Sequence, residues 1–330
     1  MGLVGLFGAA GAIGGSVASA LRASGRPYRV VGRSRGALEA EFGADPLAEI
    51  VTWNPDDPQS VKAAAQGLET LIYLVGVPYW DFRLHPILMQ KTLEGARAAG
   101  VSKLLLIGTV YPFGRPQRAR VDESHPREPH TFKGRMRKEQ EDLVLGAHGR
   151  DGLQTAILRL PDFYGPNLER SLLYRVFQAA LQGTRADLIG PIDTPHEFVF
   201  VPDVGPVVAS LIDEPRAYGR AWNLAGAGVT TQREIVERIF SEVGRPPKLR
   251  VAGPWMVRAL GLFDPFMREL VEMYYLQTTP VLMDDSALRG LLGEVRKTPY
   301  HEGIRQTLEA MKGAASSATA PLRPATARAH

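Results

Sequence analysis

The chain opens with an apolar run that ends in a glycine-rich turn, and this feature constrains its fold more than any other. Residues Leu3–Phe7 precede Gly8-Ala9-Ala10-Gly11-Ala12-Ile13-Gly14, and a helix-compatible stretch then continues through Leu21. Glycines at this spacing let a strand turn sharply into a helix, so that a pyrophosphate can approach the unpaired amides of the helix N-terminus. The spacing is Gly-x-x-Gly-x-x-Gly, whereas the commonest dinucleotide fingerprint is Gly-x-Gly-x-x-Gly. Taken alone, the turn is also compatible with a Gly/Ala-rich helix start in an unrelated fold.

Short apolar runs alternate with helical patterns along the first half of the chain. The pattern predicts further strands at 29–32, 49–53, 70–75, 103–109 and 154–160, and helices at 15–23, 58–66, 84–99 and 133–148. Apolar runs that lack polar alternation and are separated by helices are typical of buried parallel strands. We therefore predict an α/β fold with a Rossmann-type, doubly wound parallel sheet.

Beyond Pro161 the alternation becomes irregular. Helices are predicted at 171–182, 231–243 and 265–275, with returning strands at 197–201 and 221–224. We expect a dinucleotide-binding domain over 1–165, followed over 166–312 by a mixed region with a smaller substrate-binding lobe and returning sheet strands. Residues 313–330 are rich in Ala, Ser, Thr and Pro and are expected to be disordered, because they offer little apolar surface to bury.

Composition argues against several classes of protein. The 330 residues include no cysteine, which removes disulfides, thiolate metal sites and cysteine nucleophiles, and the seven histidines show no metal-ligand spacing, so no metal is expected. The net charge of +4 comes from scattered basic residues without interleaved aromatics, so nucleic acid is not an expected partner. No stretch reaches the roughly 18 apolar residues of a membrane span. The N-terminus also lacks the basic region of a secretory signal, and we expect a cytoplasmic protein.

Several short motifs follow one another in a definite order after the glycine turn. They are Asn54-Pro55-Asp56-Asp57-Pro58, Leu74-Val75-Gly76, Gly108-Thr109, Leu158-Arg159-Leu160-Pro161, Phe163-Tyr164-Gly165-Pro166, Val201-Pro202-Asp203-Val204 and Asn223-Leu224-Ala225-Gly226. This set resembles the extended short-chain dehydrogenase/reductases, the NAD-dependent epimerase/dehydratase family, over about residues 3–308. The resemblance implies a nicotinamide cofactor, a small-molecule substrate and a homodimer formed through helices that flank the fifth strand.

The resemblance also implies which residues contact the cofactor. The glycine turn, with Gly8, Ala10, Gly11, Ala12, Ile13 and Gly14, is expected to hold the pyrophosphate. Asn54-Pro55 takes the place of an adenine contact, Leu74-Val75-Gly76 lines the nicotinamide ribose, and Leu160-Pro161 abuts the nicotinamide. The apolar residues among them are equally compatible with packing at strand ends.

The end of the second strand indicates which nicotinamide cofactor is preferred. A carboxylate there binds the ribose 2′-hydroxyl of NAD, whereas a cation favours the 2′-phosphate of NADP. The sequence reads Val30-Val31-Gly32-Arg33-Ser34-Arg35, with no acidic residue beside the arginines. We expect Arg33, with Arg35 as a helper, to bind a 2′-phosphate, so that NADP(H) is preferred over NAD(H). The alternative is that either arginine is a solvated loop charge.

The catalytic motif departs from the family's pattern. In the family a Ser or Thr at the end of the fifth strand orients the substrate carbonyl, and Tyr-x-x-x-Lys on the next helix supplies the proton. Thr109 fits the hydroxyl position, but Lys133 and Arg137 stand where the tyrosine and the lysine are expected. Two cations on one helix face disfavour each other's charge, so Lys133 is a candidate proton donor, with Arg137 binding ribose hydroxyls. Both cations are equally compatible with cofactor binding alone.

Other side chains in the facing loops could replace the missing tyrosine as proton donor. Tyr111 is the most interesting of them, because it lies two residues beyond Thr109. The others are Tyr79, Asp81, His85, Asp162 and Tyr164.

The predicted helix at 265–275 carries a polar stripe of Arg268, Glu272 and Tyr275, which either faces a cleft or is solvated. Two functions stay open. The first is an NADP(H)-dependent oxidoreductase, or an epimerase/dehydratase-type enzyme, acting on a small carbonyl or hydroxyl compound. The second is a non-catalytic NADP(H)-binding sensor. The missing tyrosine favours the sensor, whereas Thr109 and the long substrate region favour the enzyme.

Overall fold

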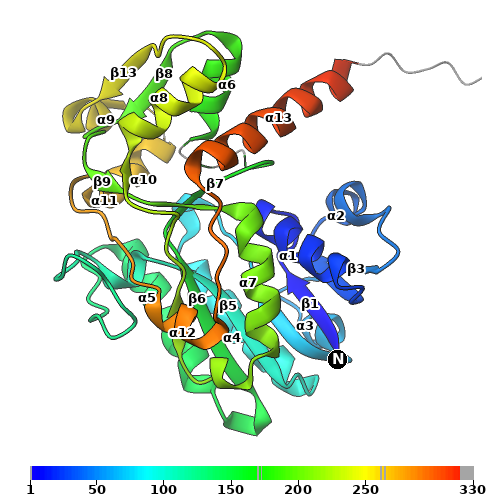
Figure 1. Ribbon diagram of the computed structural model, residues 1–330. Coiled ribbons are helices and arrows are strands. Elements are labelled where there is room, and N and C mark those ends of the chain that lie inside the picture. The colour runs from blue at the N-terminus through cyan, green and yellow to red at the C-terminus, as the bar shows by residue number, and fades with distance from the viewer. Residues whose placement is uncertain (1, 169–170, 172, 261, 264, 320–330) are drawn as a thin grey trace, which may run out of the picture.

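The predicted alternation of strands and helices builds a parallel sheet with helices on both faces (Figure 1). The computed structural model describes residues 2–168, 171, 173–260, 262–263 and 265–319. Within them, a seven-stranded sheet has the order β11-β6-β5-β4-β1-β2-β3, and every neighbouring pair is parallel. This is the doubly wound, Rossmann-type sheet that the sequence predicts. Its strands are β1 (Leu3–Phe7), β2 (Tyr28–Gly32), β3 (Ala48–Thr52), β4 (Leu68–Tyr73), β5 (Lys103–Thr109), β6 (Gln154–Leu160) and β11 (Ala221–Asn223).

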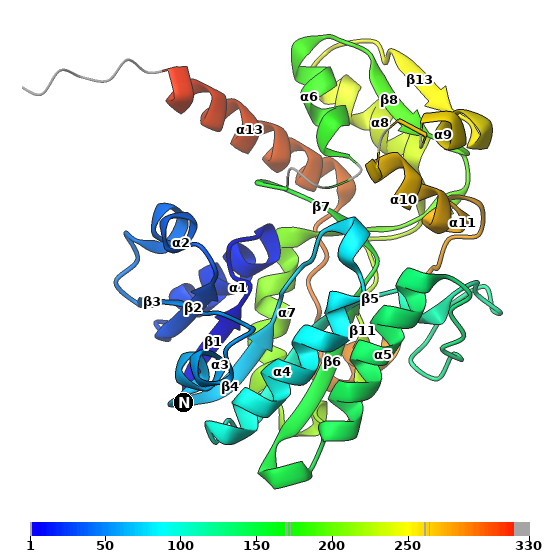
Figure 2. The same ribbon diagram turned by 180° about the vertical axis from the view of Figure 1, so that it is seen from behind.

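Helices cover the sheet in two layers. On one face lie α3, α4 and α5, which are in front of the sheet in Figure 2, and on the other lie α1 and α7, which pack against each other. The helices that accompany the sheet are α1 (Ala12–Ala23), α2 (Arg35–Phe42), α3 (Pro58–Ala65), α4 (Leu84–Ala98), α5 (Phe132–Ala147), α7 (Val201–Asp213) and α12 (Ser286–Leu292). Because both faces are covered, the strands are mainly apolar, and their buried side chains form one core on each face.

A smaller lobe lies beyond the carboxyl ends of the sheet strands (Figure 1). It contains α6 (Tyr174–Gln182), β8 (Ala186–Ile189), α8 (Gln232–Glu242), β13 (Leu249–Ala252), α9 (Pro254–Leu260), α10 (Pro265–Met273) and α11 (Tyr275–Thr278). Strands β8 and β13 pair in parallel, and α6, α8 and α13 (Tyr300–Thr319) share a separate apolar core. The lobe therefore has its own packing and covers the strand ends, where ligands of such sheets bind.

The predicted elements of the first half are confirmed. Strands β5 and β6 have the predicted bounds, and β2, β3 and β4 differ from prediction by no more than two residues at either end. No helix was predicted at α2, α7, α9, α12 or α13. Helix α7 contains Pro202 in its first turn and Pro206 further along, and prolines in a sequence usually signal the end of an element.

Two expectations for the second half need correction. The segment predicted as a returning strand at 197–201 does not join the large sheet, because β10 (Phe198–Phe200) pairs in parallel with β7 (Asp162–Tyr164) instead. The chain then turns at once into α7. The tail expected to be disordered from 313 is helical up to Thr319, because α13 continues past its packed part, and residues 320–330 lie outside the described residues. The domain boundary at 165 stays a prediction.

Candidate active site

The glycine turn has the geometry of a phosphate cradle. Gly8 has φ +86°, and a Cβ added there would lie 2.8 Å from the backbone of Val75. At Gly14 an added Cβ would lie 2.0 Å from the carbonyl oxygen of Ala9, so both positions require glycine. At Gly11, by contrast, an added Cβ would meet nothing within 4 Å. Gly11 is the N-cap of α1 and offers no side-chain cap, so the first amides of the helix receive no hydrogen bond from the cap and suit an anion.

Neighbouring strand ends bring the other expected cofactor residues to the same edge of the sheet. The amide of Leu74 donates to the carbonyl of Phe7 at 2.7 Å, so Leu74-Val75-Gly76 follows β4 directly beside the glycine turn. Thr109 pairs in register with Leu160 at the ends of β5 and β6, and Pro161 follows. The roles of these residues toward a cofactor stay predictions.

The two arginines after β2 differ in their surroundings. Arg35 forms an ion pair with Glu39 one turn along α2 at 3.1 Å. Arg33 is exposed and makes no hydrogen bond or ion pair with any residue that the structure describes. At the position expected to contact adenine, the side-chain oxygen of Asn54 accepts the amide of Asp56 at 3.0 Å and is thus engaged in a local turn, with Pro55 between them. Arg33 is therefore the more available cation for a phosphate.

Lys133 is bound by two carboxylates of the small lobe. Its ammonium pairs with Glu269 and, at 2.8 Å, with Glu272, both on α10, and its side chain is 1% exposed. The sequence led us to expect that the charge of Arg137 would disfavour that of Lys133, but the ammonium is instead paired with carboxylates 136 and 139 residues away. Of the polar stripe predicted at Arg268, Glu272 and Tyr275, Glu272 therefore contacts Lys133.

Arg137 has separate partners, although it shares a helix face with Lys133. Its guanidinium donates to Nδ1 of His85 at 3.1 Å and to the carbonyl of Ile107 at 3.3 Å. Burial, together with the neighbouring charge of Arg137, lowers the pKa of His85 to about 2, so the imidazole is neutral and accepts this hydrogen bond. Burial also lowers the pKa of Arg137. Arg137 thus ties α5 to α4 and β5, and a contact with ribose hydroxyls stays a prediction.

Tyr111 lies at the carboxyl end of β5 and is paired with a second tyrosine. Its hydroxyl is 2.6 Å from the hydroxyl of Tyr79, and its backbone amide donates to Oγ1 of Thr109 at 3.4 Å. Burial raises the pKa of Tyr79 to about 12 and raises that of Tyr111 well above its usual value of 10. Both hydroxyls are therefore protonated at neutral pH.

A histidine–aspartate pair adjoins the tyrosines. Nε2 of His196 is 2.8 Å from Oδ2 of Asp162, which follows Pro161 at the end of β6. After burial, the charge of Asp162 is one of the causes that raise the pKa of both Tyr79 and Tyr111. The sequence analysis proposed Asp162 but gave no signal for His196 or Glu269. Tyr164, another proposed donor, packs in the core of the small lobe.

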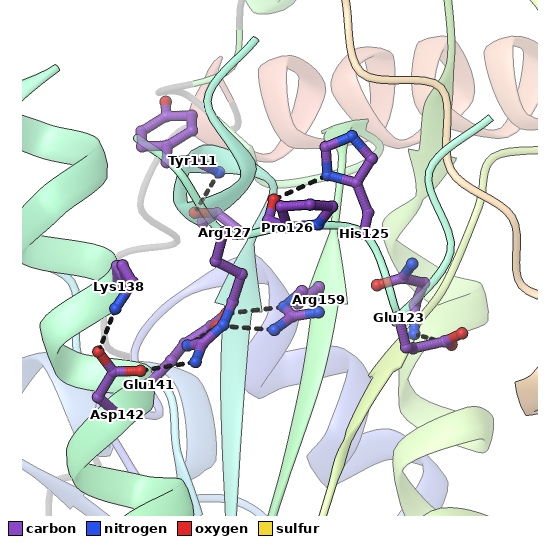
Figure 3. Close-up of polar contacts among 11 residues, drawn as sticks. Tyr111, Glu123, His125, Pro126, Arg127, Lys138, Glu141, Asp142 and Arg159 are labelled. Carbon is purple, nitrogen blue, oxygen red and sulfur yellow. Dashed lines mark hydrogen bonds and ion pairs between the residues drawn. The ribbon is translucent and has the colours of Figure 1, made fainter. Parts of the chain in front are cut away.

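A buried ion pair fixes the helix that carries Lys133. Arg159 of β6 donates to Glu141 of α5 through Nε at 2.9 Å and Nη2 at 2.7 Å, and Arg127 donates to the same carboxylate at 3.2 Å (Figure 3). The side chains of Arg159 and Glu141 are each 2% exposed. Because neither charge is solvated, each depends on the other, and the pair sets the position of α5 relative to the strand ends.

A cavity of about 400 Å³ lies apart from the tyrosines and is lined by Arg120, Glu197, Asp285 and Lys297 among others, with none of the expected catalytic residues. Within the described ranges, no group of three or more His, Asp or Glu side chains could hold a metal ion. Among the same residues, no helix has the length and apolarity needed to cross a bilayer.

Known proteins resemble this chain in sequence. Residues 4–225 match the model of the "NAD dependent epimerase/dehydratase family". A Sinorhizobium fredii protein called "Uncharacterized protein y4nL" is 26% identical over 345 residues, covering 93% of this chain and 94% of that protein. The dTDP-glucose 4,6-dehydratase of Streptomyces griseus is 24% identical over 257 residues, covering 72% of this chain and 77% of the dehydratase.

Solved structures share the fold. UDP-glucuronic acid 4-epimerase from Bacillus cereus, in complex with NAD, superposes with a TM-score of 0.79 at 16% identity, covering 94% of this chain and 99% of the epimerase. dTDP-glucose 4,6-dehydratase from Streptomyces venezuelae, also with NAD, superposes with a TM-score of 0.80 at 18% identity, covering 96% of this chain and 98% of the dehydratase. The family match spans more than half of the chain and agrees with the fold and the glycine turn. The chain belongs to the NAD-dependent epimerase/dehydratase family.

Proposed function

We propose that this protein is an NADP(H)-dependent oxidoreductase of the epimerase/dehydratase type that acts on a small carbonyl or hydroxyl compound. A nicotinamide cofactor bound along the glycine turn would supply or accept the hydride. The observation that carries the proposal is the pair of hydroxyls of Tyr111 and Tyr79, which belong to the segments after β5 and β4. Thr109, Leu74 to Gly76 and Leu160 lie at the same edge of the sheet. The structural relatives are named as complexes with NAD, which supports a nicotinamide cofactor in general.

Within this proposal, Tyr111 is the proton donor. Its backbone amide donates to Oγ1 of Thr109, the residue assigned to orient the substrate carbonyl, and its hydroxyl pairs with that of Tyr79. The ammonium of Lys133, by contrast, is held by Glu269 and Glu272. A hydroxyl both donates and accepts, so Tyr79 can donate to the Tyr111 oxygen when Tyr111 passes its proton to a substrate oxygen. That hydrogen bond stabilises the charge that develops on Tyr111 in the reaction.

The decisive experiment measures binding and turnover separately. We expect NADPH to bind, as detected by its fluorescence, and to be oxidised in the presence of at least one compound of a panel of small aldehydes, ketones and oxo acids. Tight NADPH binding with no oxidation across the panel, and no NADP⁺ reduction with the matching alcohols, would count against the enzyme.

The cofactor preference has its own test. Arg33→Ala is expected to weaken NADPH binding by about tenfold or more, since a charge-assisted hydrogen bond to a phosphate contributes about 1.5–3 kcal/mol. NADH binding is expected to stay within about twofold, because NADH carries no 2′-phosphate for the guanidinium to hold. Arg35→Ala is the matched control, because Arg35 is already paired with Glu39. Equal losses for NADPH and NADH would overturn the assignment of Arg33.

One observation favours the alternative function, a non-catalytic NADP(H)-binding sensor. Lys133 occupies the position of the family's proton donor, yet it is 1% exposed and bound by α10. A sensor would use this contact to couple the small lobe to the cofactor domain. The sensor is favoured if NADPH binding changes the protease sensitivity of α10 while no panel compound is turned over.

A further inference from the structure

Glu272 binds Lys133 in the manner of a two-point carboxylate ligand. One of its oxygens accepts the backbone amide of Lys133 at 2.9 Å, and the other accepts the ammonium of the same residue at 2.8 Å. Lys133 lies in the first turn of α5, where backbone amides have no acceptor within the helix and where an anion is favoured. A single residue therefore offers two convergent donors that match the two oxygens of one carboxylate.

The surroundings of the ammonium make an anion necessary there. Nζ of Lys133 lies 5.4 Å from the ring centre of Tyr79 and 5.7 Å from that of Phe82, and the side chain is almost fully enclosed. The aromatic faces attract the cation, but they do not replace its hydration. A charge left unpaired in such a place is strongly unfavourable, so an anion must stand opposite Lys133 as long as the site excludes water.

This carboxylate position adjoins the proposed proton donor. Tyr79, whose ring lies under the ammonium, shares a hydrogen bond with Tyr111. Gly134, the residue after Lys133, packs so closely on the backbone of Tyr111 that an added Cβ would lie 2.9 Å from its carbonyl oxygen. A carboxylate bound to Lys133 is thus close to the ring of Tyr79, and the start of α5 is close to the backbone of Tyr111.

We propose that Lys133 is the receptor for a carboxylate of the substrate, and that Glu272, supported by Glu269, occupies this receptor when no substrate is bound. The inference rests on the proposed function and deepens it, because it makes the substrate class a carbonyl or hydroxyl compound that carries a carboxylate. Such a compound exchanges one anion for another at Lys133, whereas a neutral compound would leave the ammonium unpaired. A compound that carries a carboxylate therefore displaces α10 from Lys133, and a neutral compound does not.

The first test needs no turnover. Reductive methylation of lysines, followed by peptide mass spectrometry, measures the exposure of Lys133, with the exposed Lys62 of α3 as an internal reference. Wild-type Lys133 is expected to react at least tenfold more slowly than Lys62, and Glu269→Gln/Glu272→Gln is expected to raise its rate at least tenfold. Sodium acetate is then expected to slow the variant's Lys133 reaction at least threefold relative to sodium chloride at the same concentration.

Controls keep the labelling interpretable. Asp187→Asn removes a carboxylate of the same lobe that pairs with Arg250 on the surface, and it is expected to leave Lys133 labelling unchanged. If the double variant does not unfold cooperatively on heating, the single variant Glu272→Gln carries the test, because Glu269 still pairs with the ammonium. Equal rates of Lys133 labelling in acetate and in chloride would overturn the assignment of Lys133 as a carboxylate receptor.

A second test uses matched substrates. Levulinate and 2-oxobutyrate are compared with their methyl esters in the NADPH oxidation assay, and kcat/KM of the wild type is expected to be at least tenfold higher for an acid than for its ester. An ester that is turned over as well as its acid contradicts the substrate class. If neither acids nor esters react, the proposed function fails. The labelling experiment with acetate still tests, independently of turnover, whether Lys133 binds a carboxylate.

Discussion

Glu141→Gln is expected to lower the free energy of unfolding by about 3–5 kcal/mol, because removal of one partner from a buried ion pair leaves the other charge uncompensated. Arg159 would remain 2% exposed with its two hydrogen bonds to Glu141 weakened, and Arg127 would lose its contact with the same carboxylate. Glutamine preserves the size of the side chain, so the change is one of charge. Urea denaturation followed by circular dichroism measures the loss.

The matched control for this variant is an ion pair of similar geometry on the surface. Arg233 and Asp193 approach to 2.6 Å, yet their side chains are 43% and 67% exposed. Asp193→Asn is expected to cost less than about 1 kcal/mol, since water solvates both charges when the contact is lost. A similar small loss for Glu141→Gln would mean that water reaches Arg159, and the role assigned to the buried pair would be wrong.

Tyr111→Phe is expected to lower kcat by about 10²- to 10⁴-fold, the usual contribution of a positioned general acid. NADPH binding is expected to be unchanged, since the hydroxyl is assigned to the substrate oxygen. Tyr79→Phe is expected to have a smaller effect, because Tyr79 acts on the reaction only through its hydrogen bond to Tyr111. Steady-state kinetics with the best substrate of the panel measures both losses.

The pH dependence sharpens this prediction. Burial holds the pKa of Tyr111 well above 10, so the hydroxyl keeps its proton from about pH 6 to 9 and the ratio of wild-type to variant kcat is expected to stay constant over that range. Tyr218→Phe is the control, because the Tyr218 hydroxyl donates to the carbonyl of Ile212, away from the site. Full activity in Tyr111→Phe together with a large loss in Lys133→Ala would move the proton donor to Lys133.

The sequence predicts well those features that depend on neighbouring residues. Strands β5 and β6 follow from uninterrupted apolar runs, and the glycine turn follows from two positions, Gly8 and Gly14, where any Cβ would collide with backbone. Arg33 and Thr109 were predicted as site residues because Arg33 follows β2, Thr109 ends β5, and strand ends form the ligand edge of such a sheet. Their roles stay predictions. Helix α7 was missed because its prolines mimic a break in the chain.

Contacts between remote segments could not be predicted in the same way. His196 was not recognised as the partner of Asp162, which lies 34 residues earlier, because no periodicity links β7 to the strand β9 (Pro195–His196). The hydroxyl pair of Tyr79 and Tyr111 likewise joins two separate loops, after β4 and after β5. Both tyrosines were candidates, but only their packing shows that they act as a pair.

The sequence by itself determined the Rossmann-type sheet and the glycine turn, because backbone sterics and burial of apolar runs are local and repeat along the chain. It also predicted that Lys133 stands where the family's tyrosine is expected. Only the tertiary structure decided what Lys133 faces. Helix spacing alone suggested Arg137 as its neighbour, but two carboxylates more than 130 residues away in sequence bind it instead. The state of a buried charge depends on which side chains lie next to it, and these are set by tertiary packing rather than by position in the sequence.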